Sequence, residues 1–119
     1  MKYIIMFAGT LDEQDQWAKM PKEQLAAQYE RVASWFDEHT KSGKIVGGEE
    51  LQGPSTATTV RRTNGKVTVT DGPFIESKEV IGGFAIVDVK NLDEALEMAK
   101  SWPGGSLVEV RPLVDHSAS

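Results

Sequence analysis

The sequence contains no cysteine, and this absence excludes several kinds of chemistry. Without a thiol there is no disulfide, no thiolate nucleophile and no zinc–thiolate site. Histidine is nearly as scarce, because only His39 and His116 occur, and with the scattered carboxylates they form no recognisable metal-ligand spacing. We therefore expect no bound metal, and the lack of disulfides fits a reducing, cytoplasmic compartment.

Long apolar runs and basic clusters are also missing. The apolar run near the N-terminus, Tyr3–Ala8, is too short for a signal peptide or a membrane span. The formal net charge is −5, whereas nucleic-acid binding needs a basic surface, and Arg61-Arg62 is the only adjacent basic pair. We expect neither a nucleic-acid nor a membrane partner. No phosphate-binding loop, dinucleotide fingerprint or nucleophile elbow occurs, so no cofactor is expected.

The 119 residues predict a single domain over residues 1–114, followed by a small, polar tail over 115–119 that we expect to be disordered. Tyr3–Ala8 is nearly all apolar, which indicates a central strand with both faces covered. Residues 9–20 are polar and are interpreted as an irregular segment. The further predicted strands are Lys44–Leu51, Ala57–Thr63, Lys66–Thr70, Phe84–Val89 and Leu107–Arg111.

Two helices are predicted between these strands. One begins at Pro21 and ends near Ser42-Gly43, with Leu25, Tyr29, Val32 and Phe36 on its buried face. The other follows Asn91, which acts as its N-cap, and ends before Pro103.

The order of these elements predicts an α+β fold. It reads β-α-β, then a hairpin turning at Asn64-Gly65, then β-α-β, which is the ferredoxin-like βαββαβ plan with an inserted β-hairpin. In that plan an antiparallel sheet carries both helices on one face. The other face needs a cover, and a two-fold homodimer that pairs sheet against sheet provides one.

Side-chain alternation assigns the last strand, Leu107–Arg111, to both faces of this sheet. Val108 and Val110 are expected to face the helices, whereas Glu109 and Arg111 face the opposite side. Charged groups on an enclosed sheet face have two interpretations, a ligand cleft or an ordinary interface ion pair.

Residues 69–84, VTDGPFIESKEVIGGF, concentrate charges and backbone breakers. Asp71 follows a strand and precedes Gly-Pro, so it is either a rigidly held acid–base group or the acceptor of an Asx-turn. Phe74 is expected to be a core or interface anchor. Glu76 and Lys78 either orient a polar ligand or belong to a solvated charge cluster.

Two further residues are candidates outside this segment. Glu49 and Glu50 follow the Gly47-Gly48 pair, and alternation sends one of them inward, where it offers a second carboxylate for an acid–base pair with Asp71. His39 continues the apolar face of the first predicted helix. It is either a helix-end residue that is favoured by the helix dipole or a catalytic group.

The segment Thr70–Glu79 closely resembles the signature of the DGPF family, which belongs to the larger YCII-related superfamily. The resemblance extends over nearly the whole chain. The other matching segments are Gly47–Leu51, Thr56–Arg61, Gly82–Phe84, Leu92–Leu96 and Val108–Pro112. This resemblance implies a bacterial protein with a ferredoxin-like fold that dimerises as an α+β barrel. Some relatives are encoded near alternative sigma factors or fused to them, and better-studied members of the superfamily carry a His/Asp pair suspected of catalysis.

Two hypotheses of function follow. The first is a small-molecule-binding dimer or a cofactor-independent lyase, isomerase or hydrolase, with a cleft lined by the 71–79 loop. Its catalytic residues are expected to be Asp71 and His39, and its substrate-binding residues are expected to be Glu49, Phe74, Glu76, Lys78 and Arg111. The second is a non-catalytic interaction module, accessory to transcription regulation by sigma factors.

Overall fold

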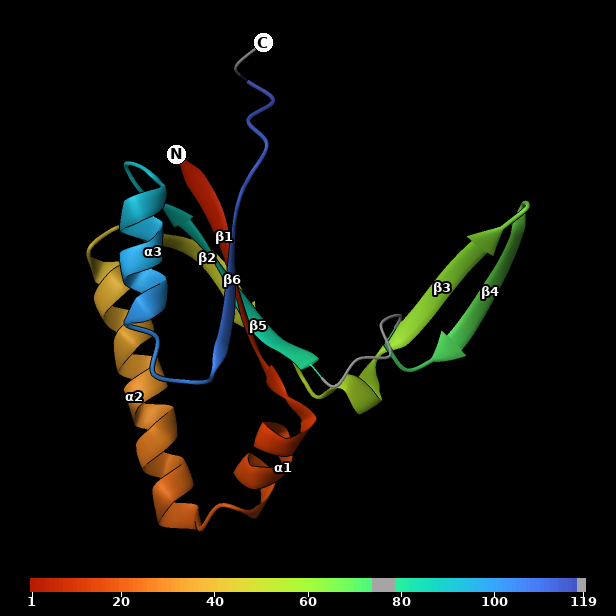
Figure 1. Ribbon diagram of the computed structural model, residues 1–119, viewed down its shortest axis with the longest axis horizontal. Coiled ribbons are helices and arrows are strands. Elements are labelled where there is room, and N and C mark those ends of the chain that lie inside the picture. Colours follow the sequence, from red (N-terminus) through yellow and green to blue (C-terminus); the bar gives the residue numbers. More distant parts are fainter. Residues whose placement is uncertain (74–78, 118–119) are drawn as a thin grey trace.

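A four-stranded antiparallel sheet forms the body of the protein (Figure 1). The computed structural model describes residues 1–73 and 79–117. The elements are β1 Lys2–Thr10, α1 Leu11–Lys19, α2 Lys22–Lys41, β2 Ile45–Glu50, a 3-10 turn Pro54–Thr56, β3 Thr58–Thr63, β4 Lys66–Asp71, β5 Glu79–Asp88, α3 Leu92–Lys100 and β6 Leu107–Pro112.

The strand order β2-β5-β1-β6 is that of the ferredoxin-like plan. Strand β1 pairs antiparallel with both β5 and β6, so the prediction of a central first strand is confirmed. Helices α2 and α3 lie side by side over one face of the sheet (Figure 1). The predicted α+β architecture is therefore confirmed.

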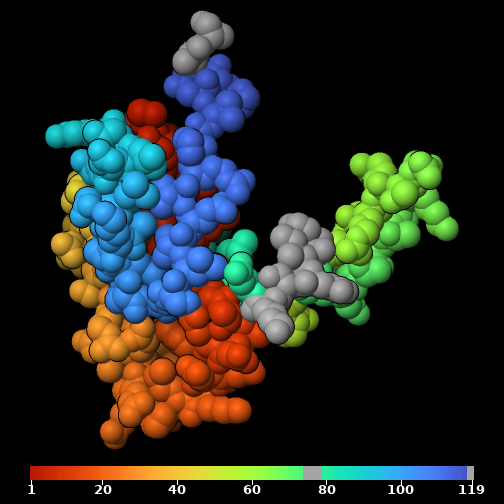
Figure 2. All heavy atoms as spheres, viewed as in Figure 1, coloured from red at the N-terminus to blue at the C-terminus, as the bar shows by residue number. Residues whose placement is uncertain are grey.

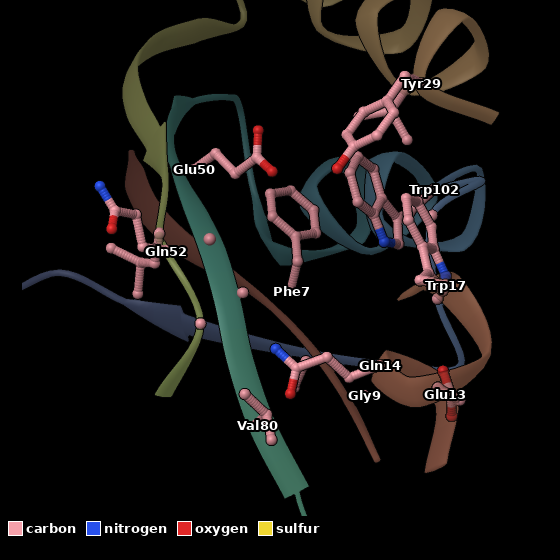
Figure 3. A pocket seen from close by; sticks show the side chains of 18 of the residues that line it. Phe7, Gly9, Glu13, Gln14, Trp17, Tyr29, Glu50, Gln52, Val80 and Trp102 are labelled. Atoms are coloured by element: carbon pink, nitrogen blue, oxygen red, sulfur yellow. The ribbon is translucent and has the colours of Figure 1, made fainter. Parts of the chain in front are cut away.

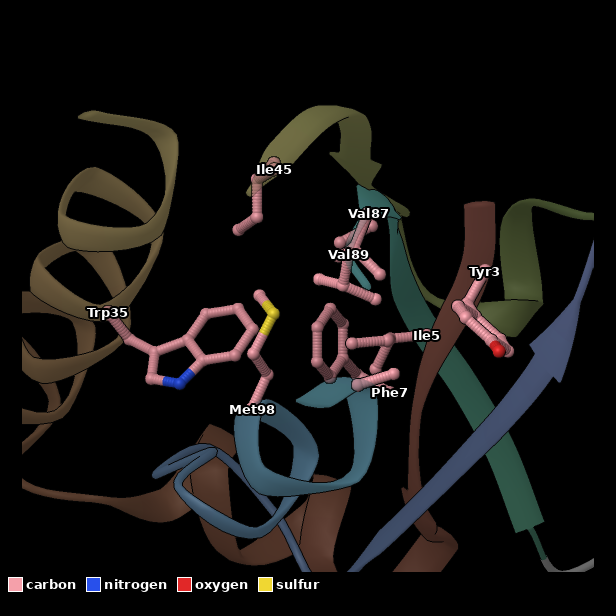
Figure 4. Packing of buried hydrophobic residues seen from close by; sticks show 10 residues of the cluster. Tyr3, Ile5, Phe7, Trp35, Ile45, Val87, Val89 and Met98 are labelled. Carbon is pink, nitrogen blue, oxygen red and sulfur yellow. The ribbon is translucent and has the colours of Figure 1, made fainter. Parts of the chain in front are cut away.

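The core lies between these two helices and the sheet (Figure 4). Alternate residues of β1 and β5 point into it, as strand geometry requires. Trp35 is the buried residue of α2, and its indole N–H donates to the Ser101 hydroxyl at 2.9 Å. The buried apolar residues are Tyr3, Ile5, Phe7, Trp35, Ile45, Ala85, Val87, Val89, Ala95 and Met98.

Residues 11–19 form a helix, so the interpretation of 9–20 as irregular was wrong. The side chain of Thr10 accepts a hydrogen bond from the backbone N–H of Glu13 at 3.1 Å and caps helix α1. Thr10 and Glu13 have the spacing of a capping box, a start signal that the polar composition concealed. None of the helices in residues 1–73 and 79–117 is both long and apolar enough to cross a bilayer.

No helix of the described residues covers the second face of the sheet (Figure 1). Strand pairing places Ile4 opposite Ile86 and Met6 opposite Phe84 on this open face. On the helix-covered side, Val108 and Val110 pack against the core, as alternation predicts.

Strands β3 and β4 form a separate two-stranded hairpin that projects from the body (Figures 1 and 2). Asn64 and Gly65 both have positive φ, at 52° and 80°, which is the turn geometry that the Asn-Gly pair predicts. At the base of the hairpin, the Thr59 hydroxyl donates to the carbonyl oxygen of Gly72 at 2.5 Å.

Candidate functional site

A cavity of about 670 Å³ opens on the helix-covered side of the sheet (Figure 3). Strands β1, β2 and β5 supply one wall. Helices α1 and α2 supply another, and the loop that follows α3 closes a third side. The cavity therefore depends on α1, the helix that the sequence did not reveal.

Aromatic rings form much of the wall. Phe7 stacks on Trp102 with ring centroids 3.9 Å apart, and Phe36 meets Phe7 edge-on at 5.7 Å. Across the cavity, Trp17 of α1 and Tyr29 of α2 form an edge-to-face pair at 5.5 Å. These pairs join β1, α1, α2 and the loop after α3, so the rings also hold the walls together.

Many of the residues that line the cavity are glycines, which lack a side chain and so allow backbone segments to lie close together. A β carbon on Gly48 would lie 2.4 Å from the Phe84 carbonyl oxygen, and Gly48 has φ +142°. A glycine pair inside a strand is typical of a bulge or a close backbone approach, and Gly47-Gly48 accompanies both, because the register of β2 against β5 also shifts between Ile45 and Gly47. The glycines that line the cavity are Gly9, Gly48, Gly53, Gly82, Gly83, Gly104 and Gly105.

Glu13 is a polar group of the cavity lining that hydrogen bonds hold in place. The Ser106 hydroxyl donates a hydrogen bond to its carboxylate. This bond, with smaller help from the backbone of Ser106 and from Thr10, lowers the pKa of Glu13 below its ordinary value. Glu13 is therefore ionised at neutral pH.

Glu50 also lines the cavity, and its side chain extends into it near Phe7 (Figure 3). Strand pairing places Glu50 opposite Gly83, which is buried on the core side of β5. No Lys, Arg or His belongs to the lining among residues 1–73 and 79–117. The charged groups on the described wall are therefore all acidic.

With this geometry in place, comparison with known proteins assigns the family. The family model of the YCII-related domain matches residues 1–117. The chain belongs to the YCII-related domain family. It is also 32% identical over 117 residues to an uncharacterized protein of Rhizobium meliloti (strain 1021), covering 95% of this chain and 92% of that protein.

The two predicted catalytic residues of this YCII-related domain do not border the cavity. Asp71 is exposed at the end of β4, paired with Thr58 across the hairpin. His39 packs against Trp35 with ring centroids 4.6 Å apart. Burial lowers the pKa of His39, while Glu38 partly opposes this effect. The structure does not bring Asp71 and His39 together.

The predicted binding residues are also spread out. Glu49 belongs to the cavity lining and is paired with Phe84 across β2 and β5. Arg111 lies on β6, and the two central strands, β5 and β1, separate it from β2. Arg111 donates to Glu109 at 2.6 Å, which is the ion pair that alternation allowed. Three further predicted residues, Phe74, Glu76 and Lys78, lie outside the described residues.

Sequence reasoning did not select Trp17, Trp102 or Glu13 for the site. Trp17 was visible as the one aromatic residue in the polar segment 9–20. Trp102 adjoins a Pro-Gly-Gly stretch that indicated only a helix end. The three residues come to line one cavity through tertiary contacts of α1 with α2 and with the loop after α3, and periodicity along the chain does not report such contacts.

Proposed function

We propose that this YCII-related domain binds a small organic molecule in the aromatic cavity. The observation that carries the proposal is the cavity itself, which measures about 670 Å³ and is lined by the aromatic rings of Phe7, Trp17, Tyr29, Phe36 and Trp102. Ligand sites typically span roughly 300–1,000 Å³ and combine apolar walls with a few placed polar groups. Glu13 and Glu50 supply such groups here.

Binding is better supported by this geometry than acid–base catalysis by the predicted pair. Asp71 and His39 lie outside the cavity lining, whereas Glu13 and Glu50 belong to it. Catalysis by Asp71 stays a prediction from the sequence. Unchanged turnover in an Asp71→Asn variant would remove Asp71 from that role.

We also infer that the chain is of the DGPF type. The part of the signature that the structure describes, Asp71-Gly72-Pro73, closes the base of the hairpin. The Gly72 N–H donates to the Ala57 carbonyl at 2.8 Å, and the Gly72 carbonyl accepts from Thr59. These bonds support a role of the signature in joining the two arms of the hairpin, β3 and β4, at its base.

The cavity proposal is tested by filling the space. Ala33 lines the cavity from the exposed side of α2, so Ala33→Phe places a ring in it at little cost to the helix. Ala27→Phe adds the same ring to the exposed surface of α2 away from the lining. A thermal-shift screen with a broad metabolite panel is expected to find ligands that stabilise the wild type and Ala27→Phe but not Ala33→Phe.

A ligand at 100 times its dissociation constant adds about 2.7 kcal/mol of stability, which is readily seen as a shifted midpoint. The proposal fails if no compound shifts the wild type. It fails as well if Ala33→Phe responds to every compound as the wild type does, because binding then occurs elsewhere.

We further propose that the open sheet face forms a homodimer. Ile4, Met6, Phe84 and Ile86 are only partly buried there, in a continuous patch across β1 and β5. Within residues 1–73 and 79–117 no helix covers the patch, and a second copy of the same patch would bury it.

Light scattering at low micromolar concentration is expected to give the mass of two chains, and Ile86→Glu is expected to reduce it to one. A monomeric wild type would contradict the dimer. In that case the open face and the projecting hairpin would be available to a different protein, since the hairpin exposes Val60, Val67 and Val69. This is the alternative function, a non-catalytic interaction module.

A further inference from the structure

We propose that the cavity selects an organic cation, a molecule that joins an ammonium or similar positive group to a flat apolar body. This inference rests on the proposed function, since it names the ligand class of the same cavity. It goes beyond binding as such, because an aromatic cavity alone would accept neutral molecules equally well.

The sign of the charge is the first argument. Glu13, Glu49 and Glu50 line the cavity, and the described wall has no basic side chain to neutralise them. The chain as a whole carries a net charge of −5, so the long-range field has the same sign. The carboxylates of the cavity wall would repel an anionic ligand. A cation is attracted by the net negative charge of the protein as it approaches and by these carboxylates once it is bound.

Two of the three cavity-lining carboxylates, Glu13 and Glu50, differ in a way that suits this role. Glu13 is fixed by the Ser106 hydroxyl at the junction of α1 with the loop after α3. By contrast, the side chain of Glu50 makes no hydrogen bond or ion pair with any residue in 1–73 or 79–117. Glu50 therefore has its full acceptor capacity available for a ligand that carries N–H donors or a positive charge.

The aromatic rings supply the second argument. Trp17, Tyr29 and Trp102 line the same cavity as Glu50 (Figure 3). Tryptophan and tyrosine faces attract cations through the ring quadrupole, and several rings around one site are a known means of holding an organic ammonium group. The same rings contact a flat apolar body, so one cavity serves both parts of the ligand.

Three indole compounds with closely similar bodies test the inference. Tryptamine is cationic at neutral pH, tryptophol is neutral and indole-3-acetate is anionic. Titration calorimetry at low salt is expected to show tryptamine binding roughly tenfold more tightly than tryptophol, with indole-3-acetate weakest. Glu50→Gln is expected to reduce this preference toward equality. Glu30→Gln removes the same charge from α2 outside the lining and is expected to leave it unchanged.

The outcomes separate this inference from the proposed function. Equal binding of tryptamine and tryptophol to the wild type overturns the cation preference but leaves a small-molecule cavity. An equal loss of preference in Glu50→Gln and Glu30→Gln also overturns it, because general charge would then be the cause. If none of the three binds, the cation inference fails, whereas the proposed function is judged by the metabolite panel and Ala33→Phe.

Discussion

Gly48→Ala is expected to destabilise the domain by roughly 2–5 kcal/mol. Gly48 has φ +142°, a backbone conformation that residues with a side chain rarely adopt. The added β carbon would also lie 2.4 Å from the Phe84 carbonyl oxygen and 2.8 Å from the Ala85 α carbon. Both atoms belong to the backbone of the central strand β5, which cannot retreat without disturbing its pairing with β1.

Gly47→Ala is the matched control, since it makes the same change one residue earlier. A β carbon on Gly47 meets only the Ile86 side chain, at 3.9 Å, which is ordinary van der Waals contact. The expected change in free energy of unfolding is within about 1 kcal/mol of the wild type. Urea denaturation of both variants measures the difference, and equal midpoints would show that the close approach of β2 to β5 is not as described.

The overall fold could be predicted from the sequence because its signals are local. The apolar run Tyr3–Ala8, the Asn64-Gly65 turn and the Asn91 cap each act within a few residues. The order of strands and helices then permits few topologies, and the ferredoxin-like arrangement is one of them. Helix α1 was missed because its sequence, LDEQDQWAK, is too polar to show an apolar stripe, and only the Thr10–Glu13 capping spacing indicates a helix start.

The candidate site could not be predicted in the same way. Sequence reasoning concentrated on the conspicuous 71–79 segment, yet the described cavity is built from Phe7, Trp17, Tyr29 and Trp102, which are far apart in the chain. On α2, the predicted buried face included Tyr29 and Phe36, but the deeply buried residue is Trp35. Tyr29 and Phe36 line the cavity, and Phe36 also packs against the core, so the helical periodicity located the inward side of α2 but not its deeply buried residue.

Phe7→Ala is expected to lower the free energy of unfolding by about 3–5 kcal/mol. Phe7 belongs both to the cavity lining and to the hydrophobic core, so its ring packs on both sides. Its side chain is 6% exposed and contacts the rings of Trp35, Phe36 and Trp102. Truncation removes three aromatic contacts and leaves a hole beside the sheet. Thermal and urea unfolding should therefore show a large loss, together with loss of any ligand found for the wild type.

Tyr29→Ala distinguishes the loss of stability from the loss of ligand binding, which are both expected in Phe7→Ala. Tyr29 is 46% exposed and lines the cavity through its contact with Trp17, so its removal should cost about 1 kcal/mol. Ligand binding is nevertheless expected to weaken in Tyr29→Ala as it does in Phe7→Ala. If Tyr29→Ala binds ligand like the wild type while Phe7→Ala does not, the loss in Phe7→Ala comes from a disordered core. The wall formed by Trp17 and Tyr29 would then have no part in recognition.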